Sequence, residues 1–197
     1  KLLNHFDIHT PMTSYHEFNK YDKGRQLIGQ LLEGKNIAVI TDAGMPGISD
    51  PGEELVKMAY EAGVTVTVLP GACACVTALT LSGLSTRRFR FEAFLPADKK
   101  ERKEVLEELK NETATIVLYE APHRLTKTLS ELFSALGERR LTVCRELTKK
   151  HETAFRTTLW EAMSYYEENE PKGECVLVLE GADREAMKKA EQEAFSE

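Results

Sequence analysis

The chain has 197 residues, of which 42% are hydrophobic and 29% charged, a balance typical of a soluble globular protein of one or two domains. No apolar stretch approaches the ~20 residues that a membrane-spanning helix needs, and the first five residues, KLLNH, do not resemble the start of a signal peptide. We therefore do not expect a membrane protein, and we expect a cytoplasmic one.

The net charge of −6 argues against a protein that binds nucleic acid through charge alone. The charge is unevenly distributed. Residues 87–156 carry 16 Lys and Arg against 12 Asp and Glu, whereas the rest of the chain is acidic. This asymmetry is compatible with one face that meets an anionic partner, and equally with ordinary solvated helix faces.

The four cysteines, Cys73, Cys75, Cys144 and Cys175, contain no C-x-x-C pair, so we expect reduced and mostly buried thiols. The histidines show no metal-binding spacing such as HExxH, and we therefore predict that the protein binds no metal.

The first third of the chain predicts alternating strands and helices. Residues 2–6 look like the end of a helix, which suggests that an upstream segment is absent. We expect a short strand at residues 8–14, a helix at 24–34 and a strand at 37–40, which is apolar enough to be buried on both faces. A helix ending at Gly63 and an alternating strand at 64–69 follow.

A Gly- and Pro-rich loop, residues 42–50, joins the strand at 37–40 to the next helix. Ligands of such sheets bind at the carboxyl ends of strands, so this loop is the first place to look for a site. It has neither the Lys-Ser/Thr ending of a Walker loop nor the GxGxxG spacing of a dinucleotide-binding loop. An ordinary tight turn explains the loop equally well.

A second candidate segment follows Pro70-Gly71, where a helix begins with residues of small volume between Ala72 and Ala78. Small residues at the start of a helix let a ligand lie on the backbone, although close packing of the helix on a sheet would explain them too.

The pattern changes near residues 83–88, which we expect to connect two domains. Beyond them we predict strands at 89–95, 115–119, 141–145, 155–159 and 176–179, and helices at 99–110, 125–136 and 160–168. This mixture predicts an α+β domain with a mixed sheet. The expected domains are 1–86, an α/β domain with a mostly parallel sheet, and 87–182, followed by a polar helical tail at 183–197.

Six motifs, TDAGMPGISDPG, LPGACA, FEAFLP, LYEAPHR, CRELTKKHE and KGECVLVLEG, occur in this order. In order and spacing the chain resembles the bacterial ribosomal RNA small subunit methyltransferase I family, of the tetrapyrrole methylase superfamily. The resemblance runs from Leu2 to about Ala182. It implies a two-domain tetrapyrrole methylase-like α/β fold, a homodimer, and S-adenosylmethionine held between the domains. The implied reaction is methyl transfer to the ribose 2′-OH of a cytidine in small-subunit (16S) rRNA.

The resemblance also implies the site residues. The cofactor-binding residues would be Ala43, Gly44, Met45, Pro46, Ile48, Cys73, Ala74, Tyr119 and Thr157. From the basic region we expect RNA contacts by Arg87, Arg88, Lys99, Lys100, Arg102, Lys103, Arg124, Arg145, Lys149 and Lys150.

Several positions depart from the family pattern. Met45 stands where the family usually has a small polar residue, Cys73 and Cys75 where Ser is common, and Thr157 where Gly is frequent. The strand and Gly-Asn loop that begin related proteins are also absent from this chain, so part of the cofactor pocket is expected to be missing.

Methyl transfer to a hydroxyl group needs alignment of the reacting atoms and a group that helps to remove the proton. Glu120 is our candidate for the base or for an orienting group, with a structural salt bridge as the alternative. Two other functions stay open. One is a methyltransferase for a tetrapyrrole or another small molecule, which the YEAPHR and RELTK segments disfavour; the other is a non-catalytic module that binds RNA or cofactor.

Overall fold

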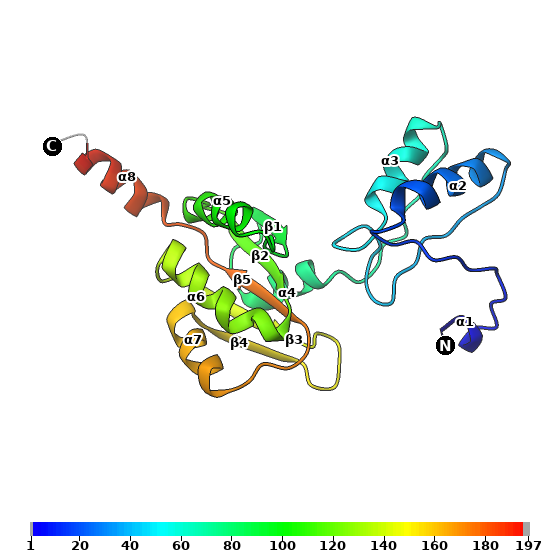
Figure 1. Cartoon of the computed structure of the whole chain (residues 1–197). Helices are drawn as coiled ribbons and strands as arrows, with labels where there is room; N and C mark the ends of the chain where they lie inside the picture. The colour runs from blue at the N-terminus through cyan, green and yellow to red at the C-terminus, as the bar shows by residue number, and fades with distance from the viewer. Residues whose placement is uncertain (1, 195–197) are drawn as a thin grey trace. The chain divides into compact units, whose positions relative to one another are not determined.

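The computed structural model describes residues 2–194, which form two compact units that divide between Ala72 and Cys73 (Figure 1). The units divide before the expected connection at 83–88, because helix α4 (Ala74–Ser82) packs on the sheet of the second unit. The division into domains at residues 86 and 182 stays a prediction.

The first unit contains the helices α1 (Leu2–His5), α2 (Lys20–Leu32) and α3 (Glu53–Glu61). Helices α2 and α3 pack against each other and supply its buried apolar side chains, Leu27, Leu55 and Ala59. Gly24 makes the close approach possible, since a Cβ atom there would lie only 2.8 Å from the sulfur of Met58.

The strands expected in the first unit, at residues 8–14, 37–40 and 64–69, are not formed, and these predictions are wrong. None of the three segments pairs with a neighbouring strand within the described residues. Ile40, Val68 and Leu69 are 60%, 67% and 86% exposed. An apolar, β-branched run becomes a strand only where another strand satisfies its backbone groups, and the local pattern does not contain that partner.

The second unit is built on a five-stranded mixed sheet in the order β1-β2-β5-β3-β4. Strands β1 and β2 are parallel, and the other neighbours are antiparallel. The expectation of a mixed sheet in this part of the chain is confirmed. The strands are β1 (Phe89–Ala93), β2 (Thr115–Glu120), β3 (Arg140–Arg145), β4 (Thr153–Thr158) and β5 (Cys175–Leu179).

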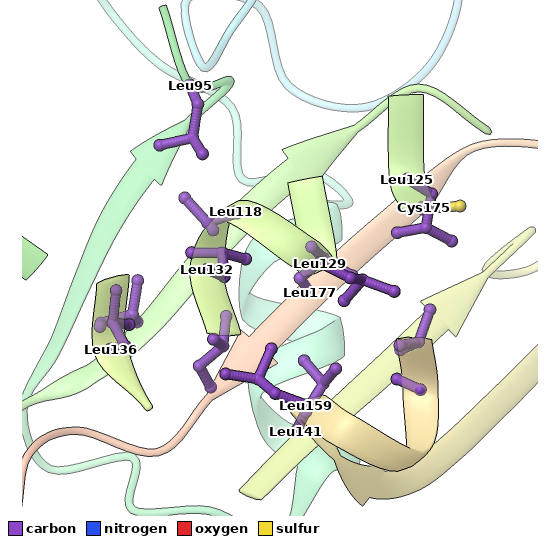
Figure 2. Packing of buried hydrophobic residues seen from close by; sticks show 14 of the residues in the cluster. Leu95, Leu118, Leu125, Leu129, Leu132, Leu136, Leu141, Leu159, Cys175 and Leu177 are labelled. Atoms are coloured by element: carbon purple, nitrogen blue, oxygen red, sulfur yellow. The ribbon is translucent and has the colours of Figure 1, made fainter. Parts of the chain in front are cut away.

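Successive side chains of the central strands point to opposite faces of this sheet, and both faces are covered. On one face Ile116, Leu118 and Leu177 pack against α5 (Lys99–Lys110), α6 (Leu125–Leu136) and α7 (Leu159–Glu168). Figure 2 shows Leu118 and Leu177 of the sheet among leucines of α6 and α7. On the other face Val117 and Val178 pack against α4. The sheet of the second unit therefore lies between α4 on one face and three helices on the other.

The helices of the second unit agree with the sequence pattern. Helices α5 (Lys99–Lys110) and α6 (Leu125–Leu136) have the predicted bounds, and α7 (Leu159–Glu168) starts one residue early. A short 3-10 helix, η1 (Pro122–Arg124), precedes α6. The tail forms α8 (Arg184–Ala194), while residues 195–197 of the predicted tail lie outside the described residues.

The cysteines also agree with the prediction, since all four are free thiols and three of them are buried. Across residues 2–194, no helix is both long enough and apolar enough to cross a membrane.

Candidate cofactor and substrate site

The first candidate segment is the loop after residue 41, which holds the expected cofactor residues of the first unit. The hydroxyl of Thr41 donates hydrogen bonds to the carbonyl oxygens of Ala43 (3.0 Å) and Gly44 (2.9 Å). Gly44 adopts φ 77° and Gly47 φ 79°, conformations that favour glycine. The side chain of Thr41 and two glycines therefore shape the loop, in which residues 42–44 are exposed.

This loop lies against the segment that ends the first unit. A Cβ atom on Gly44 would stand 3.4 Å from the carbonyl oxygen of Ala72, and one on Gly71 would stand 3.2 Å from Cγ of Met45. Both glycines thus permit a close backbone approach. Within the first unit the loop therefore lies against residues 71–72, and neither segment is preceded by a strand.

The loop also carries negative charge. Burial, with the nearby carboxylate of Asp42 as the second cause, raises the pKa of Asp50 above its ordinary value. A loop with two neighbouring carboxylates and exposed peptide groups is suited to a ligand that is both polar and cationic.

The second candidate segment is the start of α4, which Tyr119 at the end of β2 holds in place. The backbone N–H of Cys75 donates a 3.0 Å hydrogen bond to the phenolic oxygen of Tyr119. The rings of Phe91 and Phe94 lie edge-on to Tyr119, with centroid distances of 5.0 and 5.8 Å. Burial, followed by the neighbouring Cys75, raises the pKa of Tyr119, so its hydroxyl stays protonated.

Two thiols lie beside this hydrogen bond. The sulfur atoms of Cys73 and Cys75 are 3.3 Å apart, close enough for one thiol to donate to the other. Burial, followed by the contact with Cys73, raises the pKa of Cys75 to about 11. The structure therefore places Cys73 beside Cys75, which is bonded to Tyr119, and the role of these residues in cofactor binding stays a prediction.

Thr157 does not join this group. It pairs with Leu141, whose side chain belongs to the leucine cluster under α6 and α7, while Tyr119 packs on the face that α4 covers. The hydroxyl of Thr157 donates a 2.7 Å hydrogen bond to the carboxylate of Glu161. A direct contact of its side chain with a ligand beside Tyr119 is not supported, and the role of Thr157 stays a prediction.

Glu120, the candidate base, is only 2% exposed and both of its carboxylate oxygens are occupied. One oxygen accepts from Nε of Arg124 and from the backbone N–H of Ala121, each at 2.8 Å. The other accepts from the hydroxyl of Thr128 at 2.6 Å. This arrangement favours an orienting role over proton transfer, and catalysis by Glu120 stays a prediction.

The network around Glu120 continues through residues that the sequence argument did not connect. Arg102 donates to the hydroxyl of Thr128 at 2.8 Å and to the carboxylate of Glu131 at 2.5 Å. Sequence reasoning missed Thr128 and Glu131, as it missed Phe91 and Phe94 beside Tyr119. The FEAFLP motif contains both phenylalanines, and only that motif could have indicated them.

The expected RNA contacts fall into two groups. Four have side chains bound to partners within the protein: Arg102, Arg124, Arg145, which donates to Thr153 and to the carbonyl of Lys172, and Lys149, which pairs with Glu146 and Glu174. Lys100 has a 4.0 Å contact with Glu104. Within the described residues, five have no hydrogen-bond or ion-pair partner for their exposed side chains: Arg87, Arg88, Lys99, Lys103 and Lys150.

In the part of the chain that the structure describes, no three His, Cys, Asp or Glu side chains are grouped so that they could hold a metal ion. The loop of the first unit offers backbone groups and the carboxylates of Asp42 and Asp50. The second unit offers the small residues at the start of α4 beside Tyr119.

Comparison with known proteins matches residues 1–162 to the family model of the Tetrapyrrole (Corrin/Porphyrin) Methylases. Two curated relatives carry the name "Ribosomal RNA small subunit methyltransferase I". The protein of Halalkalibacterium halodurans is 52% identical over 92% of this chain and 63% of its own length. The protein of a Synechocystis strain is 52% identical over 94% of this chain and 67% of its own length. The chain thus spans about two thirds of the length of these relatives.

Solved structures support the fold. A diphthine synthase superposes with a TM-score of 0.68 at 14% identity, over 91% of this chain and 72% of its own. A uroporphyrin-III C-methyltransferase from Thermus thermophilus, complexed with S-adenyl homocysteine, superposes with a TM-score of 0.56 at 19% identity, over 82% and 73%.

The fold of these methyltransferases is thus the fold of this chain, and the expected fold class is confirmed. The matched family model and the similarity to the two curated relatives lead to one conclusion. The chain belongs to the tetrapyrrole methylase family and, within it, to the ribosomal RNA small subunit methyltransferase I family.

Proposed function

We propose that this protein transfers a methyl group from S-adenosylmethionine to the ribose 2′-OH of a cytidine in small-subunit ribosomal RNA. The observation that carries the proposal is the 52% identity, over more than nine tenths of this chain, to relatives whose name specifies that RNA and that reaction class. The choice of a cytidine 2′-OH comes from the family resemblance of the motifs.

The residues present fit S-adenosylmethionine. The loop with Gly44 and Met45 offers peptide groups to the polar parts of the cofactor, and its two carboxylates suit a cationic sulfonium. The start of α4 offers the small residues Cys73 and Ala74 beside Tyr119. When bound, S-adenosylmethionine supplies an electrophilic methyl group. A protein of the same fold has been crystallised with S-adenyl homocysteine, the form of this cofactor that lacks the transferred methyl group, which supports the fit.

Tyr119 and Glu120 would then act by holding the elements around the reacting groups in place. Tyr119 holds the start of α4 against the sheet through its bond to Cys75, and Glu120 fixes the turn that leads into α6. Direct displacement of a methyl group depends on alignment within a few tenths of an ångström, so rigid supports of this kind matter more than a strong base.

The proposal extends to the partners. A protein that methylates ribosomal RNA acts where ribosomal subunits lie, which would place it in the cytoplasm. The homodimer that the family resemblance implies is also part of the proposal, and sedimentation equilibrium of the purified chain would measure it.

Transfer of labelled methyl groups to undermethylated small ribosomal subunits tests the proposal. The full-length H. halodurans relative serves as the positive control, and naked rRNA and a tetrapyrrole serve as parallel acceptors. We expect label in a 2′-O-methyl cytidine of the subunit rRNA, which resists alkaline hydrolysis. Label in the tetrapyrrole alone, or binding of the cofactor without transfer to any acceptor, would overturn the proposal.

A matched pair of variants tests the cofactor loop separately. Both Gly44 and Gly34 have positive φ angles, 77° and 90°, so alanine strains the backbone equally at either position. Only Gly44 lies in the candidate loop. We expect Gly44→Ala to weaken binding of S-adenosylhomocysteine by about tenfold in calorimetric titration, and Gly34→Ala to leave it within about twofold. Equal effects would remove the loop from the cofactor site.

A further inference from the structure

Two adjoining recesses lie at the start of β1, in the second unit, and share Arg87, Arg88 and Ala114. The first has a volume of about 400 Å³ and also includes Arg184 and Thr113. Volumes of this size are in the range of sites for small ligands.

The second recess has a volume of about 450 Å³ and adds Phe89, Arg90 and Glu112 to the shared residues. Phe89 is 41% exposed, which leaves part of its ring open to solvent. The carboxylate of Glu112 accepts the backbone N–H of Ala114 at 2.8 Å, so it serves as a local cap within the recess.

The shared arginines carry positive charge that no acidic side chain neutralises. Within the described residues, neither Arg87 nor Arg88 has a side-chain hydrogen bond or ion pair, and both are exposed. Arg90 differs, because Glu92 and Glu108 hold its guanidinium at 2.6 and 2.8 Å. The free guanidinium groups are therefore concentrated where the two recesses meet.

The third arginine, Arg184, is positioned by contacts of residues 181–184 with residues 112 and 113. Nε of Arg184 donates to the hydroxyl of Thr113 at 3.1 Å. The N–H of Ala182 donates to the carbonyl of Glu112 at 2.6 Å, and Gly181 packs so closely on Thr113 that a Cβ atom would overlap its carbonyl group. This segment fixes the direction in which the chain enters α8.

We propose that these recesses bind one nucleotide of the substrate RNA, with its phosphate held by Arg87, Arg88 and Arg184 and its unpaired base stacked on Phe89. The identity of the RNA rests on the proposed function. Guanidinium groups match phosphate oxygens through paired hydrogen bonds, and aromatic rings are the usual platform for unpaired bases. Arg184 and Phe89 are not among the contacts expected from the sequence.

The joint arrangement favours a nucleotide strand over an isolated anion. A free phosphate needs only the first recess, whereas an aromatic face beside three arginines offers a position for a base next to its phosphate. The proposal therefore predicts binding of single-stranded RNA, with inorganic phosphate a weak competitor.

Fluorescence anisotropy with a fluorescein-labelled, single-stranded RNA of twelve nucleotides tests the phosphate contacts on the 197-residue chain. We expect Arg87→Gln, Arg88→Gln and Arg184→Gln each to weaken binding by about tenfold and to reduce the slope of log K against log salt by about 1. The matched control is Arg140→Gln, which removes the same charge where Glu180 already occupies the guanidinium, and we expect a change below about twofold.

A second pair of variants tests the base contact. Phe89→Leu keeps an apolar side chain on β1, and we expect about fivefold weaker binding of the RNA with unchanged binding of heparin, an anion without bases. Trp160→Leu removes an exposed aromatic ring of α7 and should change neither affinity. Circular dichroism of each variant shows that the fold is kept.

The inference is overturned if the chain does not bind the RNA, if the three arginine variants bind it as the parent does, or if Arg140→Gln is as damaging as they are. Inorganic phosphate that displaces the RNA at equal concentration would also overturn it. Methyl transfer to ribosomal subunits is measured independently. If the variants bind RNA and transfer methyl groups as the parent does, the nucleotide site is wrong and the proposed function stands. If the variants lose RNA binding as predicted but the parent transfers no methyl group in an assay where the positive control does, the nucleotide site stands and the proposed function is wrong.

Discussion

The two compact units use similar apolar sequences in different ways. In the second unit, β5 pairs with β2 and β3, and its apolar residues are buried on both faces of the sheet. In the first unit, the strand-like segments 37–40 and 64–69 have no partner and carry exposed Ile40 and Leu69. The difference shows that apolar periodicity alone makes a helix but not a strand, because a strand also needs neighbours along the sheet.

Removal of a buried leucine should show the largest difference in stability between the two units. Leu129 of α6 is fully buried, and Leu129→Ala is expected to lower the free energy of unfolding by about 2–5 kcal/mol through lost contacts and a cavity. Urea unfolding followed by the fluorescence of Trp160, the single tryptophan, reports on the second unit.

The matched change in the first unit is Leu32→Ala on α2, where the side chain is 64% exposed. We expect amide hydrogen exchange of α2 to change by no more than about 0.5 kcal/mol. Comparable losses at both positions would mean that the two units bury their leucines equally, contrary to the structure.

Breaking the buried network of Glu120 should have the next largest effect. Glu120→Ala leaves Arg124 and the hydroxyl of Thr128 without their acceptor, so we expect a loss of about 3 kcal/mol in the same unfolding measurement. Glu138→Ala, which removes an exposed carboxylate from the same unit, serves as the control and should stay within about 0.5 kcal/mol.

The same residue tests the predicted catalytic role. Glu120→Gln keeps the volume of the side chain and can still accept one hydrogen bond. If Glu120 orients its neighbours, transfer activity should follow the stability of the variant and recover at lower temperature. A rate that stays near zero while the fold is intact would instead identify Glu120 as the base.

Replacing a glycine by alanine should lower the stability of the second unit at Gly181 and raise that of the first unit at Gly29. Gly181→Ala would force a methyl group into the carbonyl of Thr113, and we expect a loss of about 1–3 kcal/mol in Trp160-monitored unfolding. Gly29 lies inside α2 with no atom near its missing Cβ, so Gly29→Ala should slow amide exchange of α2 by an amount equivalent to about 0.5–1 kcal/mol. Destabilisation of α2 by alanine would show a contact at Gly29 that the structure lacks.

The sequence predicts those parts of the fold that local spacing determines. Helices α5 and α6 have the predicted bounds, because leucines at helical spacing and the cap at Asp98 act within one segment. The turn residues Gly44 and Gly47 likewise predict the loop at 42–50, and both adopt positive φ angles.

Contacts between distant segments could not be predicted in this way. The bond from Cys75 to Tyr119 joins residues of α4 and β2, and the bond from Arg102 to Glu131 joins α5 to α6. Neither pair can be recognised from the spacing of residues in the sequence. The two side chains of each pair meet only because the helices and strands that carry them pack together. The pairing of Thr157 with Leu141, on the face of the sheet opposite to Tyr119, likewise leaves no local pattern, and the role of Thr157 stays a prediction.

Alkaline pH should also weaken the second unit, whose core contains Cys144 and Cys175. Burial, opposed in part by Arg156 and Arg145, raises the pKa of each thiol to about 11, whereas the ordinary value is 9.0. The folded state therefore favours the neutral thiols. Their contribution to stability is complete below pH 9 and is lost as the pH rises through about 11, at most roughly 1.4 kcal/mol per pH unit and thiol.

Urea unfolding at pH 8, 9.5 and 10.5, monitored by Trp160, measures this loss. We expect the double variant Cys144→Ala, Cys175→Ala to lose less stability than the parent between pH 9.5 and 10.5, although it starts from a lower value because of the two small cavities. Cys73→Ala removes a half-buried thiol that contacts Cys75, so it should reduce the slope by less than the double variant does. A double variant with the parent's slope would mean that the thiols ionise as readily in the folded protein as in the unfolded chain, and that the interior of the sheet is open to water.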